Sequence, residues 1–185
     1  MRIVGGALRG RALSGPRSQA IRPTSDRLRE SVFDILAHRF SDPVTGANVV
    51  DLFAGAGALG LEALSRGAAR ALFVDDGAEA RALLRANIEA LGLGGVTRIF
   101  CRDATKLGAA PLGEQFSLAF LDPPYGKDLA TPALTALVDG GWLAPGAVVI
   151  IEESAKTQID LPSSLMREDE RRYGDTQFVF ARYVP

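Results

Sequence analysis

Residues 51–60 of the chain read DLFAGAGALG, where an apolar strand pattern changes into a helical one. The run NVVDLF predicts a buried strand, and GALGLEALSRG has apolar residues at helical spacing. Between them, Gly55, Gly57 and Gly60 form a G-x-G-x-x-G pattern. Small residues at such a turn let backbone N–H groups and the helix N-terminus face a ligand. The stretch therefore predicts an α/β fold with a nucleotide-type site at the end of this strand.

The sequence beyond this stretch continues to alternate strands with helices. The expected strands are ARALFVDD, VTRIFCRD, FSLAFLD and AVVIIEE, and the expected helices are AEARALLRANIEALG and DLATPALTALVDGG. Strands separated by helices predict a parallel sheet that is covered on both faces. The last two expected strands, LMREDERRY and TQFVFARYV, are joined only by a turn at Gly174 and Asp175. The expected fold class is α/β and Rossmann-like, a mostly parallel sheet with an antiparallel C-terminal edge.

Acidic residues at the ends of these strands bear on the cofactor. Asp75 follows Gly57 by 75 − 57 = 18 residues, close to the position of a ribose-binding carboxylate in nucleotide-binding folds. A dinucleotide and S-adenosylmethionine both fit this spacing. Asp51 and Phe53 favour S-adenosylmethionine, because an acid there disfavours a pyrophosphate and favours an ammonium and a sulfonium. Asp103 ends the next strand, where an acceptor would meet the adenine amino group.

A second unusual stretch, LDPPYG at residues 121–126, ends a predicted core strand. Its two prolines stiffen the turn and remove its backbone donors. The order D-x-F-x-G-x-G and then D-P-P-Y resembles the amino-methyltransferases, which methylate an exocyclic or amide nitrogen. The resemblance implies that Asp122 and the carbonyl of Pro123 accept hydrogen bonds from the target amine, held in place by Pro123 and Pro124. Tyr125 would then stack on a base flipped out of its helix.

Aspartate at position 122 bears on the choice of base. Guanine presents two donors side by side, N1–H and the N2 amino group, and a carboxylate accepts from both. Asparagine would bring a competing donor, and adenine N1 is an acceptor that would repel a carboxylate. The residue type therefore favours guanine N2 over adenine N6.

Positive charge is concentrated at the start of the chain. Residues 1–40 contain eight arginines and three acids, a balance of 8 − 3 = +5, so the rest carries −1 − 5 = −6. A basic segment on an acidic body is typical of a protein with a polyanionic partner. We therefore divide the chain into a basic N-terminal extension of a hairpin plus a helix, residues 1–40, and a methyltransferase domain, residues 41–185. The arginines expected to contact RNA phosphates are Arg9, Arg11, Arg22, Arg27 and Arg29.

Composition argues against several other classes of protein. No apolar run approaches the roughly 18 residues of a membrane span, and Arg9 and Arg11 interrupt the start too early for a signal peptide. The single Cys101 and the single His38 argue against a disulfide and against a zinc or iron site. We expect a cytoplasmic protein without metal, monomeric, in which Cys101 is a small buried residue.

Five stretches in order along the chain carry a more specific likeness. They are MRIVGGALRGRAL, IRPTSDRLRESVFDIL, DLFAGAGALGLEALSRGA, LDPPY and GGWL. Together they resemble the RsmD family, bacterial methyltransferases for guanine N2 of the small-subunit 16S rRNA. The resemblance implies a Rossmann-like, class I S-adenosylmethionine-dependent methyltransferase domain with a β-hairpin extension. It also implies that the substrate is the 30S particle with its ribosomal proteins.

The same resemblance assigns the cofactor contacts. The methionine end of the cofactor would be lined by Asp51, Gly55 and Gly57. Asp75 would bind the ribose hydroxyls, and Asp103 the adenine. Family members often have Glu at the position of Asp75, and the adjacent Asp76 is an alternative for this role.

Three competing functions remain at this point. An adenine-N6 methyltransferase would more often have Asn at position 122 and a target-recognition domain. A protein-glutamine methyltransferase would usually have Asn-Pro-Pro-Tyr and a helical N-terminal domain. A non-catalytic assembly factor would bind rRNA and use the cofactor only for structure, but it would not need the amine-binding turn from Asp122 to Tyr125.

Overall fold

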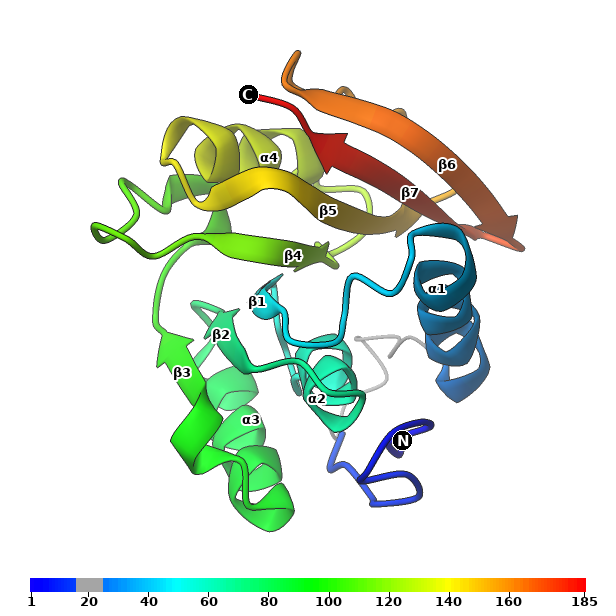
Figure 1. Ribbon diagram of the computed structural model, residues 1–185, viewed down its shortest axis with the longest axis vertical. Helices are drawn as coiled ribbons and strands as arrows, with labels where there is room; N and C mark the ends of the chain where they lie inside the picture. Colours follow the sequence, from blue (N-terminus) through cyan, green and yellow to red (C-terminus); the bar gives the residue numbers. More distant parts are fainter. Residues whose placement is uncertain (16–24) are drawn as a thin grey trace.

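The computed structural model describes residues 1–15 and 25–185 and contains a seven-stranded sheet between two layers of helices (Figure 1). The strands are β1 (Asn48–Leu52), β2 (Arg70–Val74), β3 (Thr97–Phe100), β4 (Phe116–Leu121), β5 (Leu143–Ser154), β6 (Leu165–Tyr173) and β7 (Thr176–Tyr183). Their order across the sheet is β3-β2-β1-β4-β5-β7-β6. The first five strands pair in parallel, and β7 is antiparallel to both β5 and β6. This is the sheet that the sequence predicts, including its antiparallel edge.

The helices cover the two faces of the sheet unequally (Figure 1). They are α1 (Asp26–Arg39), α2 (Ala58–Ser65), α3 (Ala78–Leu91) and α4 (Ala130–Asp139), with short 3₁₀ turns η1 (Gly94–Val96) and η2 (Ala104–Lys106). Apolar residues of α1, α2 and α3 share one buried cluster with one face of the strands, and those of α4 share a second cluster with the other face. Since successive strand residues alternate between faces, Val49 and Phe120 face α1–α3, whereas Val50 and Leu121 face α4.

The strand order changes direction next to β1, and this position decides where a ligand can bind. From β1 the chain proceeds outward to β2 and β3, and it then returns to place β4 on the other side of β1. In open α/β sheets, the carboxyl ends of the strands at such a switch point border the ligand crevice. The loops after β1 and β4 are the two stretches that the sequence singles out.

Residues 1–15, hereafter the N-terminal arm, fold back on themselves as a small hairpin that is too short to form regular strands. The N–H of Ile3 donates to the carbonyl of Arg11 at 2.9 Å, and a single antiparallel bridge pairs Arg2 with Ala12. Ile3 and Leu13 are buried in the same cluster as α1 and α2. The arm is therefore docked on the body of the protein (Figure 1).

The structure also bears on two expectations from the sequence, which concern the burial of Cys101 and membrane-spanning segments. Cys101 is exposed, in contrast to the expected buried residue, because it directly follows the edge strand β3, which has a neighbour on one side only. Among the residues that the structure describes, no helix is long and apolar enough to span a membrane.

Candidate active site

The loop between β1 and α2 has backbone conformations that require small residues. Gly55 and Gly57 have φ angles of +55° and +82°, and Gly57 is the N-cap of α2. A Cβ atom at Gly57 would lie 2.4 Å from Cδ1 of Leu84 on α3. Phe53 also has a positive φ, +58°, which is costly for a residue with a side chain. The loop, called here the glycine loop (residues 53–57), is thus held tightly between β1 and two helices.

Asp51 lies directly beneath the start of α2. The residue is 2% exposed, and its Oδ2 accepts a hydrogen bond from the N–H of Gly60 at 2.9 Å. Burial raises the pKa of Asp51 to about 8, and the charge of Asp75 adds to this rise against the opposing effect of the Gly60 hydrogen bond. A buried acid of this kind is stabilised in its ionised form by a cation placed next to it.

Asp75 connects the glycine loop to the start of α3. Its Oδ2 accepts from the N–H of Gly55 at 2.9 Å, and its Oδ1 accepts from the N–H of Gly77 at 2.8 Å. Asp76, the alternative for the ribose role, is exposed. The structure therefore places Asp75, rather than its neighbour, against the loop.

Asp103 follows β3 and is the N-cap of η2. Its Oδ1 accepts from both the N–H and the hydroxyl of Thr105, at 2.9 and 2.7 Å. The hydroxyl hydrogen bond from Thr105 lowers the pKa of Asp103, which keeps this side chain ionised at neutral pH. Because β1, β2 and β3 are adjacent and parallel, Asp51, Asp75 and Asp103 lie along one edge of the sheet.

The turn from Asp122 to Tyr125 leaves β4 at the same edge. The N–H of Asp122 lies 3.4 Å from the carbonyl of Leu52 at the end of β1, so the turn begins beside the glycine loop. Pro123 is buried, whereas Pro124 is exposed. Burial raises the pKa of Asp122 well above its usual value, and the charges of Glu152, Asp51 and Glu153 add to this rise.

Tyr125 is held by two buried residues that sequence reasoning missed. Its hydroxyl donates to Oε1 of Glu152 at 3.2 Å and lies 3.0 Å from Oγ1 of Thr176. Glu152 on β5 and Thr176 on β7 are 4% and 3% exposed, while Tyr125 as a whole residue is 38% exposed. Burial raises the pKa of Tyr125, and the charges of Glu152 and Asp122 act in the same direction, so its hydroxyl remains protonated. The anchored hydroxyl restricts how the exposed tyrosine can move at the mouth of the site.

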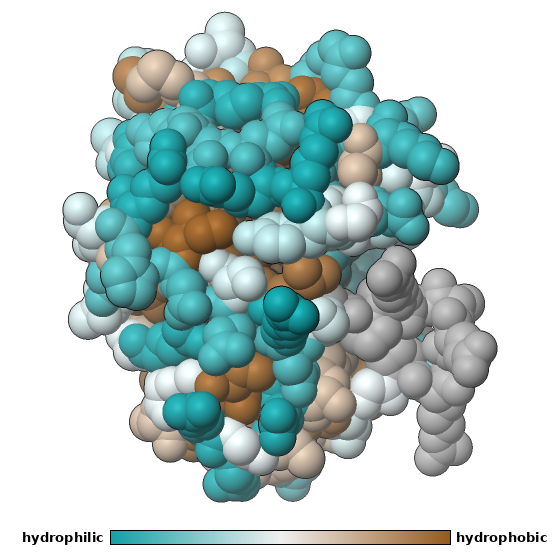
Figure 2. Space-filling model, turned by 90° about the vertical axis from the view of Figure 1, so that its right-hand side faces the viewer, coloured by the Kyte–Doolittle hydropathy of each residue, from teal (hydrophilic) through white to brown (hydrophobic). Residues whose placement is uncertain are grey.

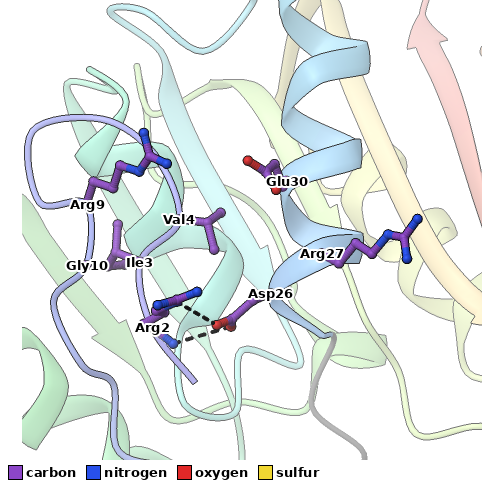
Figure 3. A pocket seen from close by; sticks show the side chains of 8 residues that line it. All are labelled: Arg2, Ile3, Val4, Arg9, Gly10, Asp26, Arg27 and Glu30. Atoms are coloured by element: carbon purple, nitrogen blue, oxygen red, sulfur yellow. Dashed lines mark hydrogen bonds and ion pairs between the residues drawn. The ribbon is translucent and has the colours of Figure 1, made fainter.

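Most of the predicted RNA-contacting arginines within the described residues lie at the surface. Arg9 on the arm and Arg27 on α1 line a hollow of about 350 Å³ between these two elements (Figure 3). Arg9 and Glu30 point toward this space, whereas Arg27 extends away from it (Figure 3). Arg11 is exposed and donates to the carbonyl of Ala90 at 2.6 Å. Arg22 lies outside the described residues.

Arg29 contradicts the expectation of a phosphate contact. Its side chain is fully buried, and it donates to Oδ1 of Asp26 at 2.8 Å and to the carbonyl of Arg2. Its Nε lies 3.7 Å from Oε2 of Glu62, which is also fully buried. Arg29 therefore connects α1 to the arm and to α2 inside the protein.

The class of protein is defined by the strand order, the glycine loop after β1, and the acids at the carboxyl ends of β1 and β2. The fold is that of a class I, Rossmann-like S-adenosylmethionine-dependent methyltransferase. Residues 1–182 match the family model described as Conserved hypothetical protein 95. The chain belongs to this family, the RsmD family.

Individual relatives are similar over most of their length. The chain is 40% identical over 157 residues to Ribosomal RNA small subunit methyltransferase D of Escherichia coli (strain K12), covering 84% of this chain and 76% of that protein. It is 30% identical over 176 residues to the protein of that name from Haemophilus influenzae, covering 94% and 89%. The solved structure of Escherichia coli yhhF has a TM-score of 0.84 and 32% identity, covering 100% of this chain and 98% of that chain.

Proposed function

We propose that this protein transfers a methyl group from S-adenosylmethionine to the N2 amine of a specific guanine in 16S rRNA, within assembled 30S particles. The observation that carries the proposal is the rigid turn from Asp122 to Tyr125, which begins beside the glycine loop at the switch point of the sheet. The names of the relatives support rRNA of the small subunit as the substrate.

The acids around the glycine loop fit this cofactor. Burial raises the pKa values of Asp51 and Asp122, and the charges of neighbouring carboxyl groups add to both rises. The ammonium and sulfonium of S-adenosylmethionine would supply two positive charges beside them. When bound, this cofactor supplies an electrophilic methyl group. Asp75 would accept from the ribose hydroxyls, and Asp103, which is ionised, would accept from the adenine amine.

The turn after β4 would orient the amine of the target base. The lone pair of an aromatic amine is delocalised into the ring, so the nitrogen attacks poorly while it stays planar. With one N–H directed at Asp122 and the other at the carbonyl of Pro123, the nitrogen pyramidalises and its lone pair points at the methyl group. This contribution is proximity and orientation, with no covalent intermediate on the protein.

Tyr125 would stack on the flipped base. Its ring is accessible, and its hydroxyl is fixed from behind by Glu152 and Thr176. A ring held in this way loses little conformational freedom when the base arrives. The carboxylate of Asp122 would accept from both donors of guanine, which favours guanine N2 over adenine N6.

The N-terminal extension, residues 1–40, would bind the rRNA backbone as the substrate-contacting part of the protein. Arg9, Arg11 and Arg27 are exposed and remain the proposed phosphate contacts within the described residues. Arg22 retains this proposed role from the sequence alone. Figure 2 shows a largely hydrophilic face with small, separated apolar areas. The protein would act as a monomer in the cytoplasm, where 30S particles are assembled.

The variant Asp122→Ala tests whether the turn serves catalysis. We expect methyl transfer to 30S subunits to fall by at least about a hundredfold, while S-adenosylmethionine still binds in isothermal titration calorimetry. Asp139→Ala, an exposed acid at the end of α4, is the matched control and should leave both properties unchanged. If Asp122→Ala transferred methyl groups at the wild-type rate, the proposed role of the turn would be wrong.

A further inference from the structure

Asn87 on α3 contacts two segments that are far apart in the sequence. The residue is 2% exposed. Its Oδ1 accepts from the N–H of Ser14 at 2.8 Å, and its Nδ2 donates to the carbonyl of Ser14 at 3.0 Å. The same Nδ2 donates to the carbonyl of Ala56 at 2.9 Å. One buried amide therefore joins the N-terminal arm to the glycine loop.

The contact to Ala56 fixes the conformation of the glycine loop. The peptide group between Ala56 and Gly57 is planar, so its carbonyl and its N–H point in opposite directions. Asn87 holds the carbonyl, and the N–H of Gly57 donates to the carbonyl of Ala54 at 2.7 Å. With both sides bonded, this peptide cannot rotate without breaking a hydrogen bond.

The contacts to Ser14 belong to a continuous attachment of the arm. The N–H groups of Val4 and Gly5 donate to the carboxylate of Glu62 on α2 at 2.9 and 2.8 Å. Ser65, one turn further along, accepts from the N–H of Leu8 at 2.9 Å through its hydroxyl. The arm is therefore bonded to α2 and α3, the two helices that begin at the proposed cofactor site.

The packing at Gly6 shows how closely the arm approaches α2. Gly6 has a φ of +74°, and a Cβ atom there would lie 1.9 Å from the carbonyl oxygen of Ser65. The N–H of Ala7 donates to this same oxygen at 2.7 Å. The arm therefore contacts α2 closely at this point, in a geometry that requires glycine at position 6.

We propose that Asn87 is a positioning residue. Through Asn87, the attached N-terminal arm holds the glycine loop in the conformation that binds the cofactor. The proposal rests on the proposed function, because it takes the ligand of the loop to be S-adenosylmethionine. An amide suits this role because it carries a donor and an acceptor on one group, and the Ser14 backbone requires both. By linkage, whatever stabilises the attached arm also favours cofactor binding, and the reverse holds equally.

Two variants separate the contacts of Asn87. Asn87→Asp has nearly the same shape and retains an acceptor for Ser14, but it places a carboxylate against two carbonyl oxygens. Ser14→Pro removes the N–H that donates to Asn87 and leaves the hydrogen bond to Ala56 untouched. Ala12→Ser is the control, a change at an exposed arm residue that leaves the contacts of Asn87 in place.

The measurement is the dissociation constant of S-adenosylmethionine by isothermal titration, on proteins whose fold is checked by circular dichroism. We expect Asn87→Asp to bind at least about tenfold more weakly and Ser14→Pro about fivefold more weakly. In steady-state assays the KM for S-adenosylmethionine should rise, with kcat at saturation unchanged. A purely structural role would change stability without this selective rise in KM.

The outcomes distinguish this inference from the function on which it rests. If wild-type affinity persists in both folded variants, the inference is wrong and the proposed function stands. If Asn87→Asp binds weakly but Ser14→Pro binds normally, Asn87 supports the loop alone and the role of the arm is wrong. Should Asn87→Asp fail to fold, the dissociation constant of S-adenosylmethionine for Ser14→Pro tests the inference. Absence of binding to the wild-type protein would overturn both proposals.

Discussion

The N–H of Gly60 donates to Oδ2 of Asp51 at 2.9 Å, across the turn that joins β1 to α2. A Cβ atom at Gly60 would lie 2.4 Å from Cε1 of Phe73 and 3.1 Å from Oδ2 of Asp51. The helix can therefore approach β1 and β2 this closely only without a side chain at position 60. The same contact holds the carboxylate of Asp51 beneath the helix start, where the proposed cofactor would present its positive charges.

Gly60→Ala should destabilise the protein by about 1–3 kcal/mol, because the added methyl group overpacks the contact with Phe73. Urea denaturation gives the free energy of unfolding. Gly95→Ala in η1 is the matched control, since no atom lies within 4 Å of a Cβ built there. Equal stability of the two variants would contradict the close approach of α2 to the sheet.

The raised pKa of Asp51 predicts how stability depends on pH in the cofactor-free protein. Its pKa is about 8 in the folded protein, against the ordinary value of 3.8 for an aspartate. Between these values the folded state keeps a proton that the unfolded state has released, so the free energy of unfolding falls as pH rises. The slope contributed by this residue reaches at most about 1.4 kcal/mol per pH unit.

Denaturation at a series of pH values between 5 and 8 measures this slope. Asp51→Asn should make it shallower and leave the contribution of Asp122, whose pKa burial also raises. S-adenosylmethionine should also flatten the slope, because a cation beside the carboxylate lowers its pKa. A cofactor-free protein whose stability rose through this range, in parallel with Asp51→Asn, would show that Asp51 is ionised without the cofactor.

Two substitutions at Tyr125 separate the contribution of its ring to methyl transfer from that of its hydroxyl. Tyr125→Phe loses the hydrogen bonds to Glu152 and Thr176 but keeps a ring that can stack, so kcat/KM should fall only about fivefold. Tyr125→Ala loses stacking as well, worth about 1–3 kcal/mol per base, and should fall by a further factor of about 5–150. Methyl transfer to 30S subunits measures both.

Thr176→Val is the companion to this pair, because it removes one partner of the hydroxyl and leaves the tyrosine intact. Its kcat/KM should fall by about the same factor as that of Tyr125→Phe. If Tyr125→Phe were as inactive as Tyr125→Ala, the hydroxyl would be the functional group and the stacking role would be wrong.

Loss of charge should affect stability at Arg29 and rRNA binding at Arg9. Arg29→Gln removes the buried partner that Glu62 and Asp26 share. Because Arg66 still pairs with Glu62 at 2.8 Å, the free energy of unfolding should fall by about 1–3 kcal/mol. Arg9→Gln should leave stability unchanged and weaken rRNA binding, reducing the slope of log affinity against log salt by about 1. Denaturation and filter binding at several salt concentrations check the two results. A weakened salt slope with unchanged stability in Arg29→Gln would restore Arg29 as a phosphate contact.

Local sequence patterns predict the fold and the glycine loop because both depend on short-range rules. The strand–helix alternation, the positive-φ glycines and the acids at strand ends lie within about 20 residues of each other along the chain. The hydrogen bonds that Asp51 and Asp75 make to Gly60 and Gly55 are of this short-range kind, with sequence separations of 9 and 20 residues.

The residues around Tyr125 could not be found in this way. Glu152 and Thr176 are separated from Tyr125 by 27 and 51 residues, and Thr176 reaches it only through the antiparallel pairing of β7 with β5. One weak signal was present, a core strand that ends in two consecutive acids, Glu152 and Glu153. Such a pattern indicates buried carboxylates but not their partners.

The burial of Arg29 was visible in principle in the helical pattern of α1. Arg29 stands four residues before Phe33 and seven before Leu36, on the face that packs against the sheet. Charge alone suggested a surface residue, whereas position on the helix indicated a buried one. A charged residue at an apolar position of a helix predicts a buried ion pair, here with Glu62.

The most direct test of the proposed function is transfer of labelled methyl groups from S-adenosylmethionine by the purified protein. The substrates are 30S subunits, naked 16S rRNA and bulk DNA in parallel, followed by analysis of the labelled nucleosides. We predict N2-methylguanosine from the 30S subunits. Labelled N6-methyladenine, or label on protein alone, would contradict the proposed roles of Asp122 and the basic extension.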